Sequence, residues 1–207
     1  MSLDQLIEGY RRFRAEQWPR ERSRFETTAR EGQKPRALVI ACSDSRVDPQ
    51  MILGARPGEL FVVRNVANLV PPYQPDAAYH GTSAAIEFGV RVLKVAHLIV
   101  IGHGMCGGVR ALLDGAPPEA QDFVARWIEI AEPARRAGEG VAPGEARYRA
   151  CEEETVRVTL ANLMSFPWVA EAVAAGRLKL HGAYFDIRDG VLHLLGSDGR
   201  FEPAPEL

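Results

Sequence analysis

The sequence predicts an α/β protein: a mostly parallel central β-sheet flanked by helices, with an N-terminal helical arm and an antiparallel edge strand. Short, nearly continuous apolar runs recur along the chain, as they do in parallel strands that are covered on both faces. Segments with helical periodicity separate these runs. Near the C-terminus, a turn signal joins the last two runs as a hairpin, which adds the antiparallel edge.

The first 35 residues predict a helical arm. Ser2 and Gln5 form a capping box, and Pro19 marks the start of a second helix. The apolar residues that follow the cap recur at helical spacing and form one stripe: Leu3, Leu6, Ile7, Tyr10 and Phe13. Basic residues cluster between residues 10 and 36, which suits either a contact surface for an acidic partner or a solvated face. We favour a solvated face, with the apolar stripe docking on a neighbour.

The core is predicted from residue 36 onward. Apolar runs at 37–41, 60–63 and 97–101 predict three strands, and helical spacing over 82–93 predicts a helix before the third strand. The later part of the chain predicts helices at 119–131, 145–164 and 168–175, a loop at 137–144 and a strand at 178–185. Asp189-Gly190 predicts a two-residue hairpin turn into a strand at 191–195.

Length and composition indicate one globular domain. The chain has 207 residues, which suits a single domain spanning 1–207, with the arm at 1–35 and the α/β core at 36–207. Apolar residues make up 46% and charged residues 25%, which excludes a disordered protein. The formal net charge of −2 gives no general attraction to nucleic acid or to a membrane surface.

The location that we expect is the cytoplasm. The chain contains no apolar run of the length that spans a bilayer, and its first residues lack the apolar stretch of a secretory signal. The three cysteines, Cys42, Cys106 and Cys151, are too few and odd in number for a disulfide framework. Cys151 falls inside a predicted helix and is interpreted as a core residue.

Two polar loops carry the candidate chemistry. Cys42, Asp44 and Arg46 directly follow the first strand, and His103 and Cys106 follow the third. Functional residues of parallel sheets gather at the carboxyl ends of the strands. We therefore expect these side chains to form one compact site.

The residue types in this site point to zinc. Zn²⁺ binds thiolate and imidazole in a tetrahedral arrangement, and Cys42, His103 and Cys106 supply three ligands. Asp44 or a water would complete the set, and an open fourth position is typical of catalytic zinc. The alternatives are buried structural cysteines, a hydrogen-bonded core histidine and an Asp44 that caps a turn or pairs with Arg46. The convergence of all four residues favours a metal site.

A dinucleotide site is a weaker interpretation of the same loop. Gly102, Gly104 and Gly107 match the spacing of the glycine fingerprint. That fingerprint requires an acidic residue at the end of the next strand, and the chain has a proline pair and a helical pattern there instead. A closed structural zinc site in a binding protein is another alternative, although it would have no use for Arg46 beside Asp44.

These loops resemble those of the β-class carbonic anhydrases. The resemblance is carried by Cys42-Ser-Asp-Ser-Arg46, by Gly102-His-Gly-Met-Cys-Gly-Gly108, by residues 57–72 and by the end of the arm at residues 32–35. It extends from about residue 10 to residue 201 and weakens between 115 and 175. Three positions depart from common family patterns. Phe88 replaces the Tyr of plant enzymes, Gly104 replaces Ser or Thr, and Val39 stands where one subgroup has the Trp of an inhibitory bicarbonate site.

The resemblance implies a zinc lyase that interconverts carbon dioxide and bicarbonate. It implies one zinc ion per chain, bound by Cys42, His103 and Cys106, with Asp44 either ligating the metal or orienting a water and Arg46 as its partner. It also implies a homodimer or homotetramer with exchanged arms and active sites at subunit interfaces. The residues that match the family's substrate pocket are Gln33, Phe61, Val66, Phe88 and Gly107.

We expect a zinc-bound hydroxide as the nucleophile, with Asp44 and Arg46 as a gate. Arg46 would hold Asp44 off the metal, while Asp44 on the metal would block the reaction. His80 is a candidate proton carrier, and a histidine that merely starts a helix is the simpler interpretation. The alternative substrates are CS2 and COS, which relatives with this fold hydrolyse.

Overall fold

The computed structural model describes residues 1–205 and confirms the predicted fold class. Within these residues, six strands form one sheet: β1 Ala37–Cys42, β2 Leu60–Asn65, β3 His97–His103, β4 Lys179–Phe185, β5 Leu192–Leu195 and β6 Phe201–Pro203. Their order is β2-β1-β3-β4-β5-β6. The first four strands pair in parallel, and β5 and β6 extend the sheet in antiparallel fashion.

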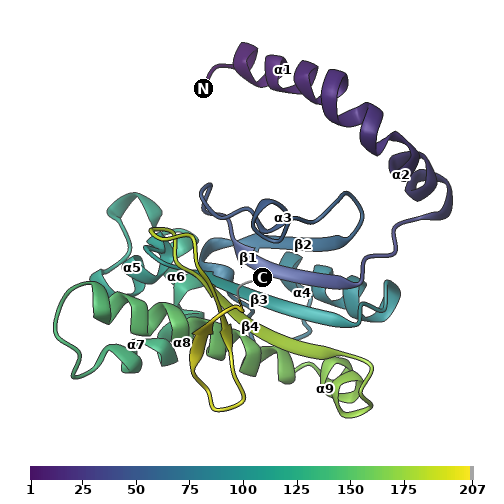
Figure 1. Cartoon of the computed structure of the whole chain (residues 1–207). Helices are drawn as coiled ribbons and strands as arrows, with labels where there is room; N and C mark the ends of the chain where they lie inside the picture. Colours follow the sequence, from purple (N-terminus) through teal and green to yellow (C-terminus); the bar gives the residue numbers. More distant parts are fainter. Residues whose placement is uncertain (206–207) are drawn as a thin grey trace.

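Helices surround this sheet and extend from it (Figure 1). The α-helices are α1 Leu3–Arg12, α2 Trp18–Glu31, α3 Pro49–Ile52, α4 Gly81–Glu87, α5 Gly107–Asp114, α6 Val124–Ile128, α7 Glu132–Arg135, α8 Glu145–Met164 and α9 Pro167–Ala174. Short π-helical segments continue α1 at Phe13–Gln17 and α4 at Phe88–Val92. The capping box of α1 is present as predicted from Ser2 and Gln5.

The main core lies between one face of the sheet and the helices α4, α8 and α9. Leu38 and Ile40 of β1 are fully buried there, together with Val156 and Leu163 of α8 and Val169 of α9. The other face buries a smaller apolar cluster around β1 and β3. The alternation of buried side chains between the two faces fixes the register of the strands.

The register aligns the ends of the strands that carry the candidate site. Cys42 at the end of β1 pairs with Asn65 at the end of β2. Ala41 pairs with Ile101, so β3 runs on for two residues to His103 at the same edge. The two polar loops, which follow β1 and β3, therefore leave the sheet side by side.

Two predicted elements need correction, and one strand was not predicted. The single helix at 119–131 is wrong, because the side chain of Gln121 bonds to Ala116 O and Pro117 O and closes a 3-10 turn at Pro118–Ala120. Only α6 and a further 3-10 turn, Glu129–Ala131, lie in the rest of that range. The hairpin that joins β4 and β5 is also longer than predicted.

That hairpin has a four-residue turn instead of the predicted two-residue turn. Asp186 N–H donates to Val191 O at 2.9 Å, so residues 187–190 form the loop. Gly190 takes a left-handed φ of 73°, which glycine adopts without strain. The strand that was not predicted is β6, whose three residues are too few to produce a strand periodicity.

Across residues 1–205, the helices lack the combination of length and apolar character that crossing a membrane requires.

Candidate metal centre

The structure brings Cys42, His103 and Cys106 together at the carboxyl edge of the sheet. Cys42 ends β1, His103 ends β3 and Cys106 caps the N-terminus of α5. Their potential ligand atoms all lie within 4.8 Å of one another, and all three residues are buried. The folded chain therefore presents three clustered ligand atoms from two loops.

The hydrogen bonds of His103 suit a metal ligand. Its Nδ1 lies 2.8 Å from the carbonyl oxygen of Gly104, which assigns the ring proton to Nδ1. Nε2 is buried and has no hydrogen-bond partner within the described part of the chain. An imidazole lone pair beside two sulfur atoms is a donor set that zinc prefers. The residues present thus fit a zinc ion.

The two thiols share negative charge. A hydrogen bond from Cys106 is the largest effect that lowers the pKa of Cys42, to about 4, and His103 adds to it. The same hydrogen bond, followed by burial, raises the pKa of Cys106 well above its usual value. Burial is the largest single effect and lowers the pKa of His103, but Cys42, the Gly104 carbonyl and Asp44 together leave that pKa raised. Cys42 therefore supplies a thiolate before any metal binds, and Cys106 would become a thiolate when a cation replaces its proton.

Asp44 and Arg46 form a bidentate ion pair beside this group. Arg46 Nε lies 2.9 Å from Asp44 Oδ1, and Arg46 Nη2 lies 2.7 Å from Asp44 Oδ2. Arg46 Nη2 also donates to Met105 O at 3.1 Å, which joins the two loops. The hydrogen bonds from Arg46 hold the pKa of Asp44 well below its usual range. Asp44 is thus ionised at neutral pH and held by Arg46.

Arg64 is a site residue that the sequence did not reveal. Its Nε donates to Cys42 O at 2.9 Å, and its Nη2 donates to Asp44 O at 2.7 Å. These bonds fix the backbone of the first loop from the neighbouring strand β2. The signal was its place near the end of a predicted strand, at the same edge as Cys42.

The five predicted pocket residues divide into two groups. Gly107 directly follows Cys106, and Val66 lies beside it, since its Cγ1 would be 2.9 Å from a Cβ on Gly108. Phe61 instead pairs with Leu38, four residues before Cys42, which is about 13 Å along the strand. Val66 and Gly107 therefore adjoin the candidate metal centre of their own chain, and Phe61 does not.

The remaining two residues do not adjoin Cys42 within the chain either. Phe88 stacks on Phe61 with 5.8 Å between the ring centroids. Gln33 is exposed and precedes β1, at the opposite end of that strand from Cys42. Within one chain, these three side chains are thus remote from Cys42.

His80 directly precedes α4 as its N-cap, in agreement with the interpretation of this histidine as one that starts a helix. Its Nε2 lies 2.7 Å from Asp76 Oδ1. His80 also lines a cavity of about 650 Å³ with Val66, Phe123 and Trp127. That cavity adjoins the candidate site through Val66.

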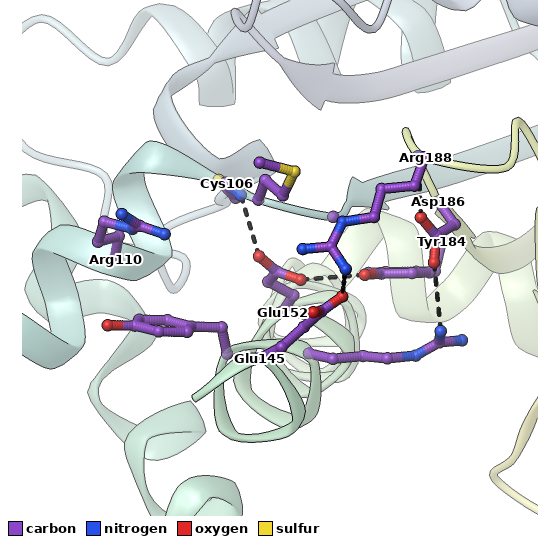
Figure 2. A pocket seen from close by; sticks show the side chains of 11 residues that line it. Cys106, Arg110, Glu145, Glu152, Tyr184, Asp186 and Arg188 are labelled. Carbon is purple, nitrogen blue, oxygen red and sulfur yellow. Dashed lines mark hydrogen bonds and ion pairs between the residues drawn. The ribbon is translucent and has the colours of Figure 1, made fainter. Parts of the chain in front are cut away.

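Glu152 and Tyr184 lie behind the second loop and were also not predicted. Figure 2 shows Glu152 of α8 between the backbone of Cys106 and the hydroxyl of Tyr184. A small cavity of about 150 Å³ adjoins them. Glu152 stands in a run of acidic residues that resembles a solvated helix face, so the sequence offered no signal for its burial.

The comparisons with known proteins agree with this geometry. A family model described as carbonic anhydrase matches residues 37–192. Beta carbonic anhydrase 3 of Arabidopsis thaliana is 35% identical over 209 residues, which cover 98% of this chain and 80% of that protein. The structure of the beta-carbonic anhydrase CcaA matches with a TM-score of 0.90 and 34% identity, over 99% of this chain and 92% of that chain.

A further match is a structure from work on two tetrameric beta-carbonic anhydrases of the filamentous ascomycete Sordaria macrospora. Its TM-score is 0.82 at 30% identity, and the match covers 93% of this chain and 96% of that chain.

Proposed function

We propose that this chain, which belongs to the β-class carbonic anhydrases, converts carbon dioxide and water reversibly to bicarbonate and a proton. The reaction takes place at a zinc ion held by Cys42, His103 and Cys106. The observation that carries the proposal is the buried group formed by these three residues at the carboxyl edge of the sheet. The free Nε2 lone pair of His103 supports it.

Zinc, when bound, would supply a Lewis acid that lowers the pKa of water towards neutrality. The chain's contribution begins with Asp44. Oδ1 of Asp44 accepts from both the backbone N–H and Nε of Arg46, while Oδ2 accepts one hydrogen bond within residues 1–205, from Nη2. Oδ2 therefore keeps acceptor capacity and can orient a water through its proton.

Arg46 acts in this proposal as the gate that the sequence predicts. With both Asp44 oxygens bound to Arg46, the carboxylate would be kept off a zinc ion held by the three ligands, which would leave a ligand position for water. If Arg46 releases Asp44, the carboxylate is free to fill the position and to stop turnover. The charge-assisted bidentate geometry favours the open state.

A second copy of the chain completes the pocket in this proposal. Gln33, Phe61 and Phe88 are remote from Cys42 in their own chain, so a partner's copies would supply the missing wall, with two apolar rings and one amide group. A homodimer or homotetramer of single-domain chains follows, in line with the tetrameric relatives of Sordaria macrospora. The cytoplasmic location stays a prediction.

The experiment combines zinc analysis with stopped-flow hydration of carbon dioxide. We expect about one zinc ion per chain and rapid turnover in the wild type. Cys106→Ser should lose the metal and the activity, because it removes one of three ligands. Cys151→Ala is the matched control, since Cys151 is buried but lies outside the group. A full zinc content in Cys106→Ser, or turnover of CS2 but not of carbon dioxide, would overturn the proposal.

A further inference from the structure

We infer that Glu152 and Tyr184 are positioning residues that hold the metal ligand Cys106 in place from behind. The inference rests on the metal centre proposed above, and it concerns residues that do not contact the metal themselves.

The carboxylate of Glu152 uses both of its oxygens towards this end of the sheet. Oε1 accepts from the backbone N–H of Cys106 at 2.9 Å, and Oε2 accepts from the hydroxyl of Tyr184 at 3.0 Å. Glu152 is 3% exposed and Tyr184 is 2% exposed. A buried carboxylate is costly unless it is hydrogen-bonded, so Glu152 depends on the Cys106 N–H and the Tyr184 hydroxyl as they depend on it.

The packing of α8 on β3 places Glu152 under the turn. A Cβ on Gly102 would lie 2.6 Å from Val156 Cγ2 and 3.4 Å from the carbonyl oxygen of Glu152. Only a residue without a side chain admits the helix this close to the strand. Tyr184 reaches the same point from β4, where it pairs with Gly102 in the sheet register.

Gly104 leaves the space that the tyrosine hydroxyl occupies. A Cβ at this position would lie only 3.0 Å from Tyr184 Oη. The backbone of Gly104 is also fixed, because its N–H donates to Phe185 O at 2.9 Å and its carbonyl accepts from His103. The turn is thus shaped around the hydroxyl that bonds to Glu152.

The turn needs this support because its backbone is strained. Met105 takes a left-handed φ of 58°, a conformation that non-glycine residues keep only when their surroundings impose it. Arg46 holds the carbonyl of Met105 on one side, and Glu152 holds the N–H of Cys106 on the other. Fixing this peptide fixes the direction of the Cys106 side chain and therefore the place of its sulfur.

The test measures metal binding directly. Glu152→Ala, Glu152→Gln, Tyr184→Phe and the wild type are titrated with zinc in competition with a chromophoric chelator. The Co²⁺-substituted proteins are compared by visible absorption, because these bands report the angles between the ligands. Glu154→Ala is the matched control, since Glu154 is on the same helix but pairs with Arg157 at the surface.

We expect Glu152→Ala to bind zinc 10- to 100-fold more weakly, as removal of a residue that orients a metal ligand usually does. Glu152→Gln should restore part of the affinity, because its amide oxygen still accepts from Cys106 N–H. Tyr184→Phe should show a smaller loss and a shifted Co²⁺ spectrum, and Glu154→Ala should match the wild type.

Wild-type affinity and an unchanged Co²⁺ spectrum in Glu152→Ala would overturn the inference, and so would an equal loss in Glu154→Ala. If Glu152→Ala fails to fold, Glu152→Gln and Tyr184→Phe decide, and wild-type behaviour in both overturns it. A wild type that binds no zinc would instead refute the proposed function, so the two failures are distinguishable.

Discussion

Arg46 illustrates, at the scale of single residues, how an exposed ion pair acquires a role other than stability. Its side chain is 44% exposed, and ion pairs in such positions contribute little to folding. Its geometry is nevertheless bidentate, and it also binds the carbonyl of Met105 in the second loop. Arg46 therefore fixes where the Asp44 carboxylate lies relative to the metal ligands.

Replacing Arg46 should separate catalysis from metal binding. We expect Arg46→Ala to lower carbon dioxide hydration by about 100-fold or more, the usual loss when a group that handles protons is misplaced. The zinc content should stay at about one per chain, since the three ligands are unchanged. Arg135→Ala, which breaks an exposed pair with Glu132 away from the site and the arm, is the control. Stopped-flow assays with metal analysis check this, and wild-type turnover in Arg46→Ala would refute the gate.

The residues of the site differ in how visible they are in the sequence. Cys42, Asp44, Arg46, His103 and Cys106 could be predicted because each follows an apolar run that ends at a loop, and parallel strands align such ends. Glu152 could not, because its burial depends on how closely α8 approaches β3. Tertiary packing of this kind leaves no periodic signal in one sequence.

At the scale of helices and strands, some elements could likewise be predicted from the sequence and others could not. The strands β1 and β3 could be predicted because they are largely buried and read as apolar runs, and β2 shows a similar run although it is a half-buried edge strand. The segment at 119–131 misled because its apolar spacing is helical, whereas the hydrogen bonds of the Gln121 side chain close a local turn. Local bonds between side chain and backbone compete with a helix, and spacing alone does not register them.

The contact of α8 with β3 should make Gly102 intolerant of a side chain. Gly102→Ala would place a methyl group 2.6 Å from Val156 Cγ2, and overpacking of this kind costs about 1–3 kcal/mol of unfolding free energy. Gly81→Ala is the control, because a Cβ there meets nothing within 4 Å. Urea denaturation of both variants measures the difference, and equal stabilities would show that α8 yields readily.

Another prediction concerns the amino ends of β3 and β4, where His97 Nδ1 lies 3.0 Å from His181 Nε2. Burial, followed by the charges of His97 and Lys179, lowers the pKa of His181. The unfolded chain therefore takes up this proton more readily, and stability falls as the pH drops through the ordinary histidine range. His181→Gln should lose less stability than the wild type between pH 7 and pH 5. Thermal denaturation at both values tests the sign, and a larger loss in the variant would contradict it.

At the scale of the whole molecule, the arm is the feature that one chain leaves incomplete. Every residue of α1 is exposed or half-buried, and the apolar stripe Leu3, Leu6, Ile7 and Tyr10 is 40–71% exposed. Figure 1 shows α1 reaching away from the sheet. Two ion pairs tie α2 to the body, Glu21–Arg56 at 3.0 Å and Arg24–Glu59 at 3.2 Å. An exposed apolar stripe of this kind marks a contact surface for another molecule. The proposed pocket, whose residues lie apart within one chain, would be completed by the same molecule, a second copy of the chain.

Weakening the stripe should therefore disturb assembly and catalysis while leaving the metal in place. We expect Leu6→Lys, and more strongly a deletion of residues 1–12, to lower the mass of the particle in light scattering. Turnover should fall in parallel, because Gln33, Phe61 and Phe88 would no longer reach a partner's site. The zinc content should persist, since Cys42, His103 and Cys106 come from one chain. Glu8→Gln changes the net charge by the same single positive unit on the polar face of α1 and should leave the mass unchanged. A deletion variant that keeps the wild-type mass and turnover would show that the pocket is completed without the arm.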